Sequence, residues 1–219
     1  MGLASATRRD HLLRAALGRS VVASLPRTLA VFALPEESDG AFEAAGVPLL
    51  YCGVGKINAT RALTRELLRY ASAGEPPPLV VNFGSAGSRT HDPHRFFGCH
   101  RFVQRDMDAS GLGFALGTTP FDPTPACLEF PHYFTSLPPA TCGSGDSFAT
   151  GDVGIGCDVV DMEAYALAKV CWHERAAFAC VKYVTDGADE AAAQHWKDNV
   201  HKSALEFLRL YREVAARND

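Results

Sequence analysis

The stretch VVNFGSAGS, residues 80–88, joins a buried strand to a turn that suits a ligand. Its apolar part begins at Leu79 and ends at Phe83, which is the pattern of a strand covered on both faces. Small residues follow, and they leave backbone amides and hydroxyls free to approach a polar molecule. The stretch therefore predicts one strand of a covered sheet with a binding site at its carboxyl end.

The rest of the chain alternates between apolar runs and helical spacing. Further runs of strand length are residues 29–34, 49–52 and 177–184, and helical spacing marks the residues after Gly55, residues 161–173 and residues 196–216. We expect paired strands within residues 101–116, around Asp106-Met107-Asp108, and a proline-rich connection over residues 118–139. Buried strands that alternate with helices predict an α/β fold.

Length and charge limit the function. The 219 residues fit one domain that is large enough to bury a substantial core. The net charge of -4 offers no basic face, so we expect a small-molecule ligand and no nucleic acid partner. No apolar run has the length that crosses a bilayer, so we expect no membrane partner.

The N-terminal extension, residues 1–26, differs in composition from the domain that we assign to residues 27–219. It carries four arginines and one acid, and its apolar part is too short and mixed for a secretory signal. We expect an amphipathic helix that packs on the domain through Leu12, Leu13, Ala16 and Leu17, and an organelle transit peptide stays open as the alternative.

The seven cysteines are an odd number without a C-x-x-C pair, which is typical of a reducing compartment. We therefore expect a cytoplasmic protein. Several cysteines stand in apolar runs, among them Cys52 and Cys180, and we expect these thiols to be core residues.

Two acids stand in otherwise apolar runs. Glu163 lies within Val160–Ala164 (VDMEA), and Asp186 lies within Val184–Asp189 (VTDGAD). A lone carboxylate in such a run costs several kcal/mol unless a partner or a ligand uses it. Together with the turn at Gly84–Ser88, these acids predict a pocket that binds a polyhydroxylated molecule and does acid chemistry on it.

Several strand-end signals occur in one order along the chain. They are Glu36-Glu37, Gly53–Lys56, Gly84–Gly87, Ser144–Phe148, Val160–Ala164 and Thr185-Asp186. In this order, over residues 28–215, the chain resembles the methylthioadenosine/S-adenosylhomocysteine nucleosidases of the nucleoside phosphorylase superfamily. The resemblance implies a single-domain three-layer α/β sandwich with a central mixed twisted sheet. It also implies hydrolysis of the N-glycosidic bond of an adenine nucleoside, without a cofactor, by a homodimer.

The resemblance assigns the chemistry to three acids. Asp186 matches the general acid that protonates N7 of the purine, and Glu37 matches the base that activates water, with Glu36 as the fallback. Glu163 matches the residue that holds the ribose hydroxyls, and Met162 beside it packs beneath the sugar.

The remaining site residues are also assigned by the resemblance. Ser85, with Ala86 and Gly87, matches the turn near the ribose and the attacking water, and Thr185 supplies a hydroxyl beside the acid. Phe148 matches the aromatic residue that stacks on adenine, and the backbone of Ala149 reads the base edge. Five apolar residues fall where relatives line the alkylthio pocket: Leu34, Val54, Leu112, Pro120 and Trp196, with Leu112 expected from a partner subunit.

Other functions stay open at this point. A purine nucleoside phosphorylase of this type carries an arginine where this chain has Asn82, which favours water over phosphate, although Arg89 and Lys56 keep the phosphorylase possible. Futalosine and general adenosine hydrolases would share the same catalytic residues, and a binding or storage protein would share the fold. The spacing of His91, His94, Cys99 and His100 fits no standard zinc site, so we expect no metal. The chain also departs from relatives in a short segment, 121–141, and in residues 1–26.

Overall fold

The described strands pair into one mixed sheet, in a computed structural model that describes residues 26–149, 155–189 and 192–218. The amphipathic helix that we predict within residues 1–26 lies outside the described residues, which begin at Pro26. In chain order the elements are β1 (Thr28–Phe32), α2 (Pro35–Ser38), α3 (Ala41–Ala44), β2 (Leu49–Tyr51), α4 (Lys56–Ala73), β3 (Leu79–Gly87), β4 (Phe96–Gln104), the 3-10 helix η1 (Ser110–Leu112), β5 (Cys127–Glu129), β6 (Pro139–Ser144), β7 (Val159–Asp161), α5 (Ala164–Glu174), β8 (Phe178–Asp186), α6 (Ala192–Asn199), the 3-10 helix η2 (Val200–Ser203) and α7 (Ala204–Ala215).

The sheet contains both parallel and antiparallel pairs. Strand β3 pairs in parallel with β1 and β8 and antiparallel with β7. Strand β4 pairs in parallel with β6 and antiparallel with β5 and β8, and β6 pairs in parallel with β7. The pairs β3–β8–β4–β6–β7–β3 therefore close a ring. The β3–β7 pair that completes it consists of one pair of residues, Gly87 and Val160.

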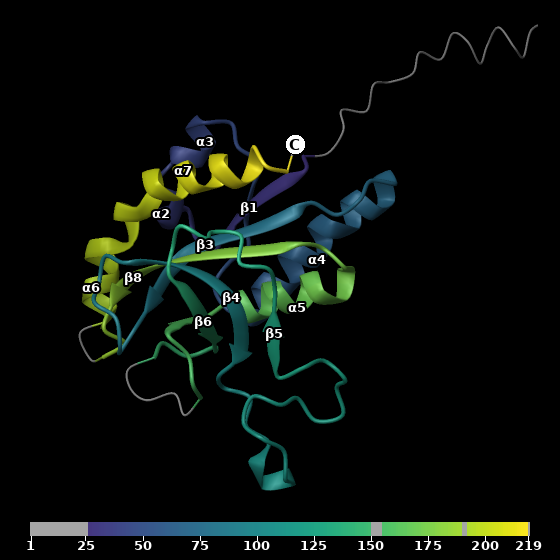
Figure 1. Ribbon diagram of the computed structural model, residues 1–219, viewed down its shortest axis with the longest axis vertical. Helices are drawn as coiled ribbons and strands as arrows, with labels where there is room; N and C mark the ends of the chain where they lie inside the picture. The colour runs from purple at the N-terminus through teal and green to yellow at the C-terminus, as the bar shows by residue number, and fades with distance from the viewer. Residues whose placement is uncertain (1–25, 150–154, 190–191, 219) are drawn as a thin grey trace, which may run out of the picture.

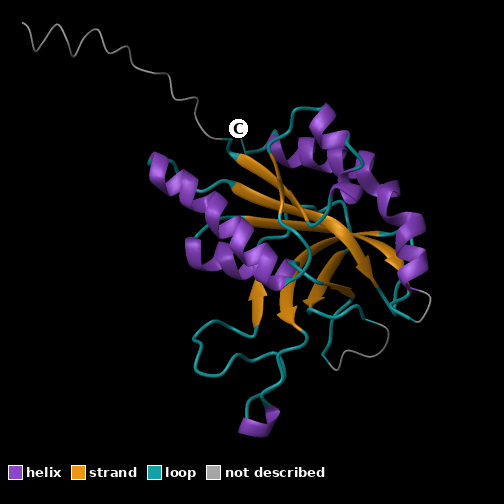
Figure 2. Ribbon diagram, turned by 180° about the vertical axis from the view of Figure 1, so that it is seen from behind, coloured by secondary structure: helices purple, strands orange, loops and turns teal. Residues whose placement is uncertain are grey.

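Helices cover both faces of the sheet (Figures 1 and 2). Helices α4 and α5 pack on one face, where Leu63 and Leu167 belong to one buried cluster. Helices α3 and α7 cover the other face, where a second buried cluster contains Phe42 and Phe207. This arrangement confirms the predicted three-layer α/β sandwich with a central mixed sheet.

Four predictions about local structure differ from what the structure shows. Residues 101–116 do not form paired strands: β4 ends at Gln104, and its partners β5, β6 and β8 come from far along the chain. The chain leaves the sheet there, and the carboxylate of Asp106 pairs with Lys56 at 2.5 Å. The connection over residues 118–139 is also interrupted, because it contains β5.

The helices predicted over 161–173 and 196–216 have different bounds. Asp161 ends strand β7, and α5 begins only at Ala164, because the Asp161 carboxylate accepts the backbone N–H of Ala164 at 2.9 Å. The second segment is two helices with η2 between them. The Asn199 side chain, which donates to the Thr185 carbonyl at 2.8 Å, fixes the end of α6 against β8, so α7 starts in a new direction.

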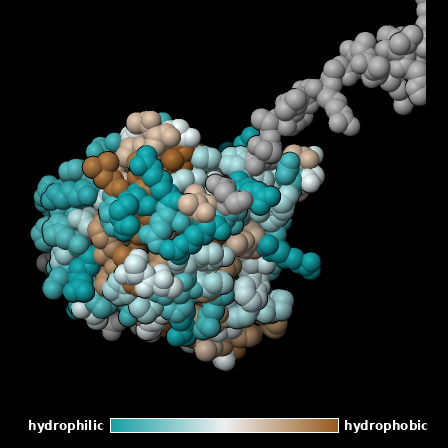
Figure 3. Space-filling model, turned by 45° about the horizontal axis from the view of Figure 1, so that its top comes forward, coloured by the Kyte–Doolittle hydropathy of each residue, from teal (hydrophilic) through white to brown (hydrophobic). Residues whose placement is uncertain are grey.

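A long excursion, residues 105–126, leaves the sheet between β4 and β5, and we call it the arm. Its helix η1 projects from the body at the bottom of Figure 1. The arm carries Leu112, which is 74% exposed, and Phe121, which is 92% exposed. The face in Figure 3 mixes hydrophilic side chains with smaller apolar patches. No described helix is long and apolar enough to cross a membrane.

All seven cysteines are free thiols, and five of them are buried. Cys52 and Cys180 are among the buried ones, so their predicted place in the core is confirmed. Burial raises the pKa of the Cys52 thiol to about 12, so this thiol stays protonated and unreactive at neutral pH.

Candidate active site

One cavity lies where the carboxyl ends of β1, β3, β7 and β8 meet. Thirteen of the fifteen predicted site residues line it: Leu34, Glu37, Val54, Ser85, Ala86, Gly87, Phe148, Ala149, Met162, Glu163, Thr185, Asp186 and Trp196. Leu112 and Pro120 do not, because both belong to the arm. The cavity therefore brings these residues together from seven separate segments of the chain.

Glu37 is fixed by four hydrogen bonds. It is buried in the one-turn helix α2, where Oε2 accepts the backbone N–H groups of Ala33 at 3.0 Å and Leu34 at 3.2 Å. Its Oε1 accepts the backbone N–H of Ser85 at 2.8 Å and the Ser85 hydroxyl at 2.9 Å. The same hydroxyl accepts the indole N–H of Trp196 at 2.9 Å. Trp196, expected only as an apolar wall, is thus also a hydrogen-bond partner of the turn.

Asp186 ends β8 and is buried beside the turn of β3. Its Oδ2 accepts the hydroxyl of Thr185 at 2.7 Å, and its Oδ1 accepts the backbone N–H of Ala188 at 3.0 Å. Burial raises the pKa of the Asp186 carboxyl above its usual range. A carboxyl held in this way, at the wall of a cavity, is suited to give a proton to a ligand.

Glu163 precedes α5 and is also buried. Its Oε1 accepts the backbone N–H of Gly55 at 2.8 Å, so it ties the segment before α4 to the end of β7. Burial first, and then the charge of Asp161, raise the pKa of Glu163 to about 8.

This raised pKa predicts a pH-dependent stability. Between the usual value of 4.5 and about 8, folded Glu163 keeps a proton that the unfolded chain releases, so the free energy of unfolding falls as the pH rises through that window. We expect Glu163→Gln to remove most of this fall, measured by urea unfolding at several values from pH 5 to pH 8.5. Glu174→Gln, at the exposed far end of the same helix, is the matched control. A fall that is equally steep in Glu163→Gln and in the parent would contradict the assignment.

Sequence reasoning missed a buried ion pair behind the cavity. Lys182, 1% exposed on β8, holds its Nζ 2.8 Å from Oδ2 of Asp161. Asp161 also accepts the Ser144 hydroxyl through Oδ1 at 2.5 Å. Burial alone would lower the pKa of Lys182, but the charge of Asp161 outweighs it and holds the pKa well above its usual range. A lysine inside the apolar run FACVKYV was the available signal.

The Lys182 ammonium also lies close to Glu37. At Gly84, a side-chain Cβ would be 3.1 Å from both Lys182 Nζ and Glu37 Oε1. A side chain at this position would crowd both groups. The lysine charge therefore offsets part of the repulsion between the carboxylates of Glu37 and Glu163.

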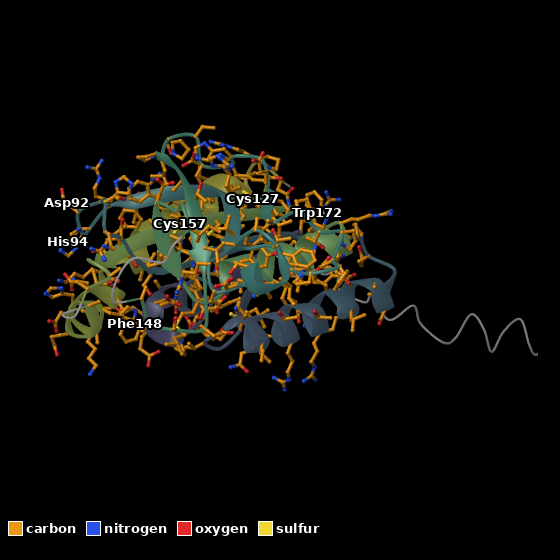
Figure 4. The ribbon with its side chains drawn as sticks, turned by 90° about the horizontal axis from the view of Figure 1, so that it is seen from below. Asp92, His94, Cys127, Phe148, Cys157 and Trp172 are labelled. Carbon is orange, nitrogen blue, oxygen red and sulfur yellow. The ribbon has the colours of Figure 1, made fainter. Side chains whose placement is uncertain are left out.

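Phe148 stands at the rim of the cavity, on the loop after β6, and is 46% exposed. In Figure 4 it lies on the same side of the view as Asp92 and His94, away from Trp172. Arg105, which sequence reasoning did not single out, also lines the cavity and is buried.

The described residues contain no group of three or more His, Cys, Asp or Glu side chains placed to hold a metal ion. His94 instead pairs its Nδ1 with the Tyr183 hydroxyl at 2.6 Å, and the ring of His91 packs on Phe97. These histidines therefore have structural partners.

Comparison with known proteins gives related results from sequence and from structure. A family model described as Phosphorylase superfamily matches residues 153–217. The 5'-methylthioadenosine/S-adenosylhomocysteine nucleosidase of Marinomonas sp. (strain MWYL1) is 28% identical over 188 residues, which cover 75% of this chain and 78% of the relative. The same enzyme of Anoxybacillus flavithermus is 27% identical, with coverage of 78% and 81%.

Solved structures agree on the fold. A Helicobacter pylori 5'-methylthioadenosine/S-adenosylhomocysteine nucleosidase, in complex with a pyrrolidine compound, superposes with a TM-score of 0.76 at 19% identity, covering 89% of this chain and 99% of the other. A futalosine hydrolase mutant of Helicobacter pylori superposes with a TM-score of 0.74 at 19% identity, covering 86% and 99%. These comparisons confirm the resemblance of this chain to the methylthioadenosine/S-adenosylhomocysteine nucleosidases of the nucleoside phosphorylase superfamily.

Proposed function

We propose that the domain of residues 27–219 hydrolyses the N-glycosidic bond of methylthioadenosine, S-adenosylhomocysteine or both, to free adenine and a thio-sugar. The observation that carries the proposal is the placement of Asp186, Glu37 and Glu163 in the lining of one cavity. The curated relatives, which are named as nucleosidases for these two compounds, support the choice of substrate.

The proposed chemistry uses each acid differently. Asp186 donates its proton to N7 of the purine, so the electron pair of the breaking C1'–N9 bond leaves on a neutral base. Glu37, oriented by Ser85, takes a proton from water while the water oxygen bonds to C1'. Glu163 accepts hydrogen bonds from the ribose hydroxyls, which strengthen as positive charge develops on the sugar. The sum of these steps is the addition of one water molecule across the bond.

The other lining residues divide between base and tail. Phe148 stacks on adenine, the Ala149 backbone reads its edge, and Met162 packs beneath the sugar. Leu34, Val54 and Trp196 form the wall for the alkylthio tail, and Leu112 and Pro120 of a partner subunit complete it. Ala86 and Gly87, beside Ser85, and Thr185, beside Asp186, form the rest of the cavity wall.

Water fits the site better than phosphate does. A phosphate nucleophile needs cations beside the sugar, but Arg105 is the one basic side chain among the described lining residues. Its guanidinium donates to the loop after β6. Asn82 donates to the Val31 carbonyl at 3.1 Å, and Lys56 pairs with Asp106. Neither residue is therefore available for phosphate.

The decisive experiment measures adenine release from methylthioadenosine, adenosylhomocysteine, adenosine and futalosine, with and without phosphate, and identifies the sugar product. Phosphate-independent release of the free thio-sugar supports the proposal. A sugar 1-phosphate would make the protein a phosphorylase, preference for futalosine would change the substrate, and no release from any of the four would leave a binding protein.

We also propose a homodimer in the cytoplasm, acting in methionine salvage. The free thiols support a reducing compartment. Support for the dimer comes from the exposed apolar residues of the arm, Leu112 and Phe121, and from the absence of Leu112 and Pro120 from the cavity of their own subunit.

Leu112→Asp tests the dimer. We expect it to shift the protein toward monomer and to lower kcat/KM by about tenfold or more, because a buried charge at an interface core is costly. Sedimentation velocity and the nucleosidase assay measure the two effects. Leu205→Asp, 77% exposed on α7, is the matched control. A fully active Leu112→Asp protein of unchanged mass would contradict both the dimer and the partner-supplied wall.

A further inference from the structure

We propose that Arg105 is a positioning residue for base recognition: its guanidinium holds the loop Ser144–Ala149, which we call the base loop, in the conformation that presents Phe148 and Ala149 to the purine. The inference rests on the proposed nucleosidase function. It assigns to Arg105 a task that none of the predicted site residues performs.

The first observation is a buried cation that has no ionic partner among the described residues. Arg105 is 8% exposed, and no carboxylate of the described residues forms a salt bridge with it. Its Nε is buried and has no hydrogen-bond partner in the described part of the chain. Burying a guanidinium in this way is costly, so the arginine needs a compensating use.

The second observation is where its hydrogen bonds go. One terminal nitrogen donates to the carbonyl of Ser147 and, at 3.4 Å, to the carbonyl of Gly145, and the other donates to the Ser147 hydroxyl at 3.3 Å. All three acceptors belong to the base loop. A planar guanidinium can bind several oxygens in one fixed geometry, which an ammonium cannot do.

The fit between arginine and loop is close. A Cβ at Gly145 would lie 2.8 Å from Cζ of Arg105 and 3.0 Å from its Nε. A side chain at this position would push the guanidinium out of its present place against the loop backbone. The arginine and the glycine therefore form one packing unit.

The base loop has other anchors at its start, where the Gly145 N–H donates to the Asp161 carbonyl at 3.1 Å, and at its middle. The backbone N–H of Asp146 donates to Asp106 at 2.9 Å, and the Asp146 carboxylate accepts the backbone N–H of Lys56 at 2.8 Å. Beyond this point Phe148 is half exposed, so packing does little to fix it. Arg105 binds at Ser147, the residue directly before Phe148, and is the described side chain whose hydrogen bonds reach the loop next to the ring.

Loss of this contact affects binding of the base more than the chemical step. Phe148 and Ala149 contact the base in the ground state and in the transition state alike, so a displaced loop raises KM with a smaller change in kcat. We expect Arg105→Met to weaken the binding of free adenine and to raise KM for methylthioadenosine by about tenfold to a hundredfold. Arg105→Lys keeps the positive charge but loses the planar guanidinium that binds several oxygens at once. We expect the binding free energy of adenine in this variant to recover less than half of what Arg105→Met loses.

The experiment measures adenine affinity by calorimetry, nucleosidase kinetics and thermal unfolding for Arg105→Met, Arg105→Lys and Gly145→Ala in the full chain. Gly145→Ala keeps the arginine but adds a methyl group that pushes its guanidinium away from the loop, so it gives the same kinetic effect if the packing unit is real. Arg101→Met, at an exposed arginine on β4 shortly before Arg105, is the matched control and leaves both constants unchanged.

The outcomes separate this inference from the proposed function. A parent protein that is active, with Arg105→Met and Gly145→Ala both binding adenine as tightly as the parent, overturns the role of Arg105 alone. A fall in kcat with unchanged adenine affinity also overturns it. A parent that neither binds adenine nor hydrolyses a nucleoside overturns the proposed function, and the inference with it.

Discussion

Asp186→Asn is expected to lower kcat for adenine release by about two to four orders of magnitude, because general acid catalysis contributes a factor of this size. The asparagine keeps the size of the aspartate and can still accept the backbone N–H of Ala188, so folding and nucleoside binding stay largely intact. Single-turnover adenine release measures the chemical step, and calorimetry with adenine measures the binding. Asp92→Asn, an exposed aspartate with the same chemical change, is the matched control.

A second substrate shows that the loss is one of proton donation. p-Nitrophenyl riboside has a leaving group that needs no proton, so the acid contributes little to its cleavage. We therefore expect Asp186→Asn to hydrolyse this compound at a rate within a few-fold of the parent. Equal losses on both substrates would give Asp186 a structural role in place of the acid role.

The fold was predictable where one element carries its own pattern. The apolar runs at residues 29–34 and 79–83 became β1 and β3, and the helix after Gly55 became α4. The failures at the ends of elements share one physical cause, which is a side chain that bonds to a backbone group outside its own helix or strand. Asp161 and Asn199 end or bend their elements through bonds to Ala164 and Thr185, and local periodicity contains no sign of such bonds.

The site was predictable because strand ends converge. Glu37, Ser85, Glu163 and Asp186 each follow or end a strand, and one cavity gathers all of them. The sequence could not reveal what lies behind them. Lys182 stood out in its apolar run but without a visible partner, and Arg105 stood beside Asp106 in a segment expected to form paired strands. Neither could be matched to its partner before the topology was known.

Lys182→Met is the variant for which we expect the largest combined effect on stability and activity. The change leaves Asp161 buried without its cation, which costs roughly 3–5 kcal/mol of unfolding free energy. It also removes the positive charge that lowers the pKa of Glu163, so that pKa rises further. Urea unfolding measures the first effect, and the pH dependence of kcat/KM measures the second. Lys197→Met, on the exposed side of α6, is the control.

The double variant Lys182→Met with Asp161→Asn separates the two effects. Removing both charges relieves the unpaired aspartate, so we expect much of the lost stability to return, while asparagine can still accept the N–H of Ala164. The double variant still lacks the cation that offsets the repulsion between Glu37 and Glu163. If Lys182 also acts on these two acids, the activity therefore stays low. A double variant that recovers stability and full activity together would show that Lys182 serves only to neutralise Asp161. Recovery of stability alone would place the lysine charge in the electrostatics of the reaction.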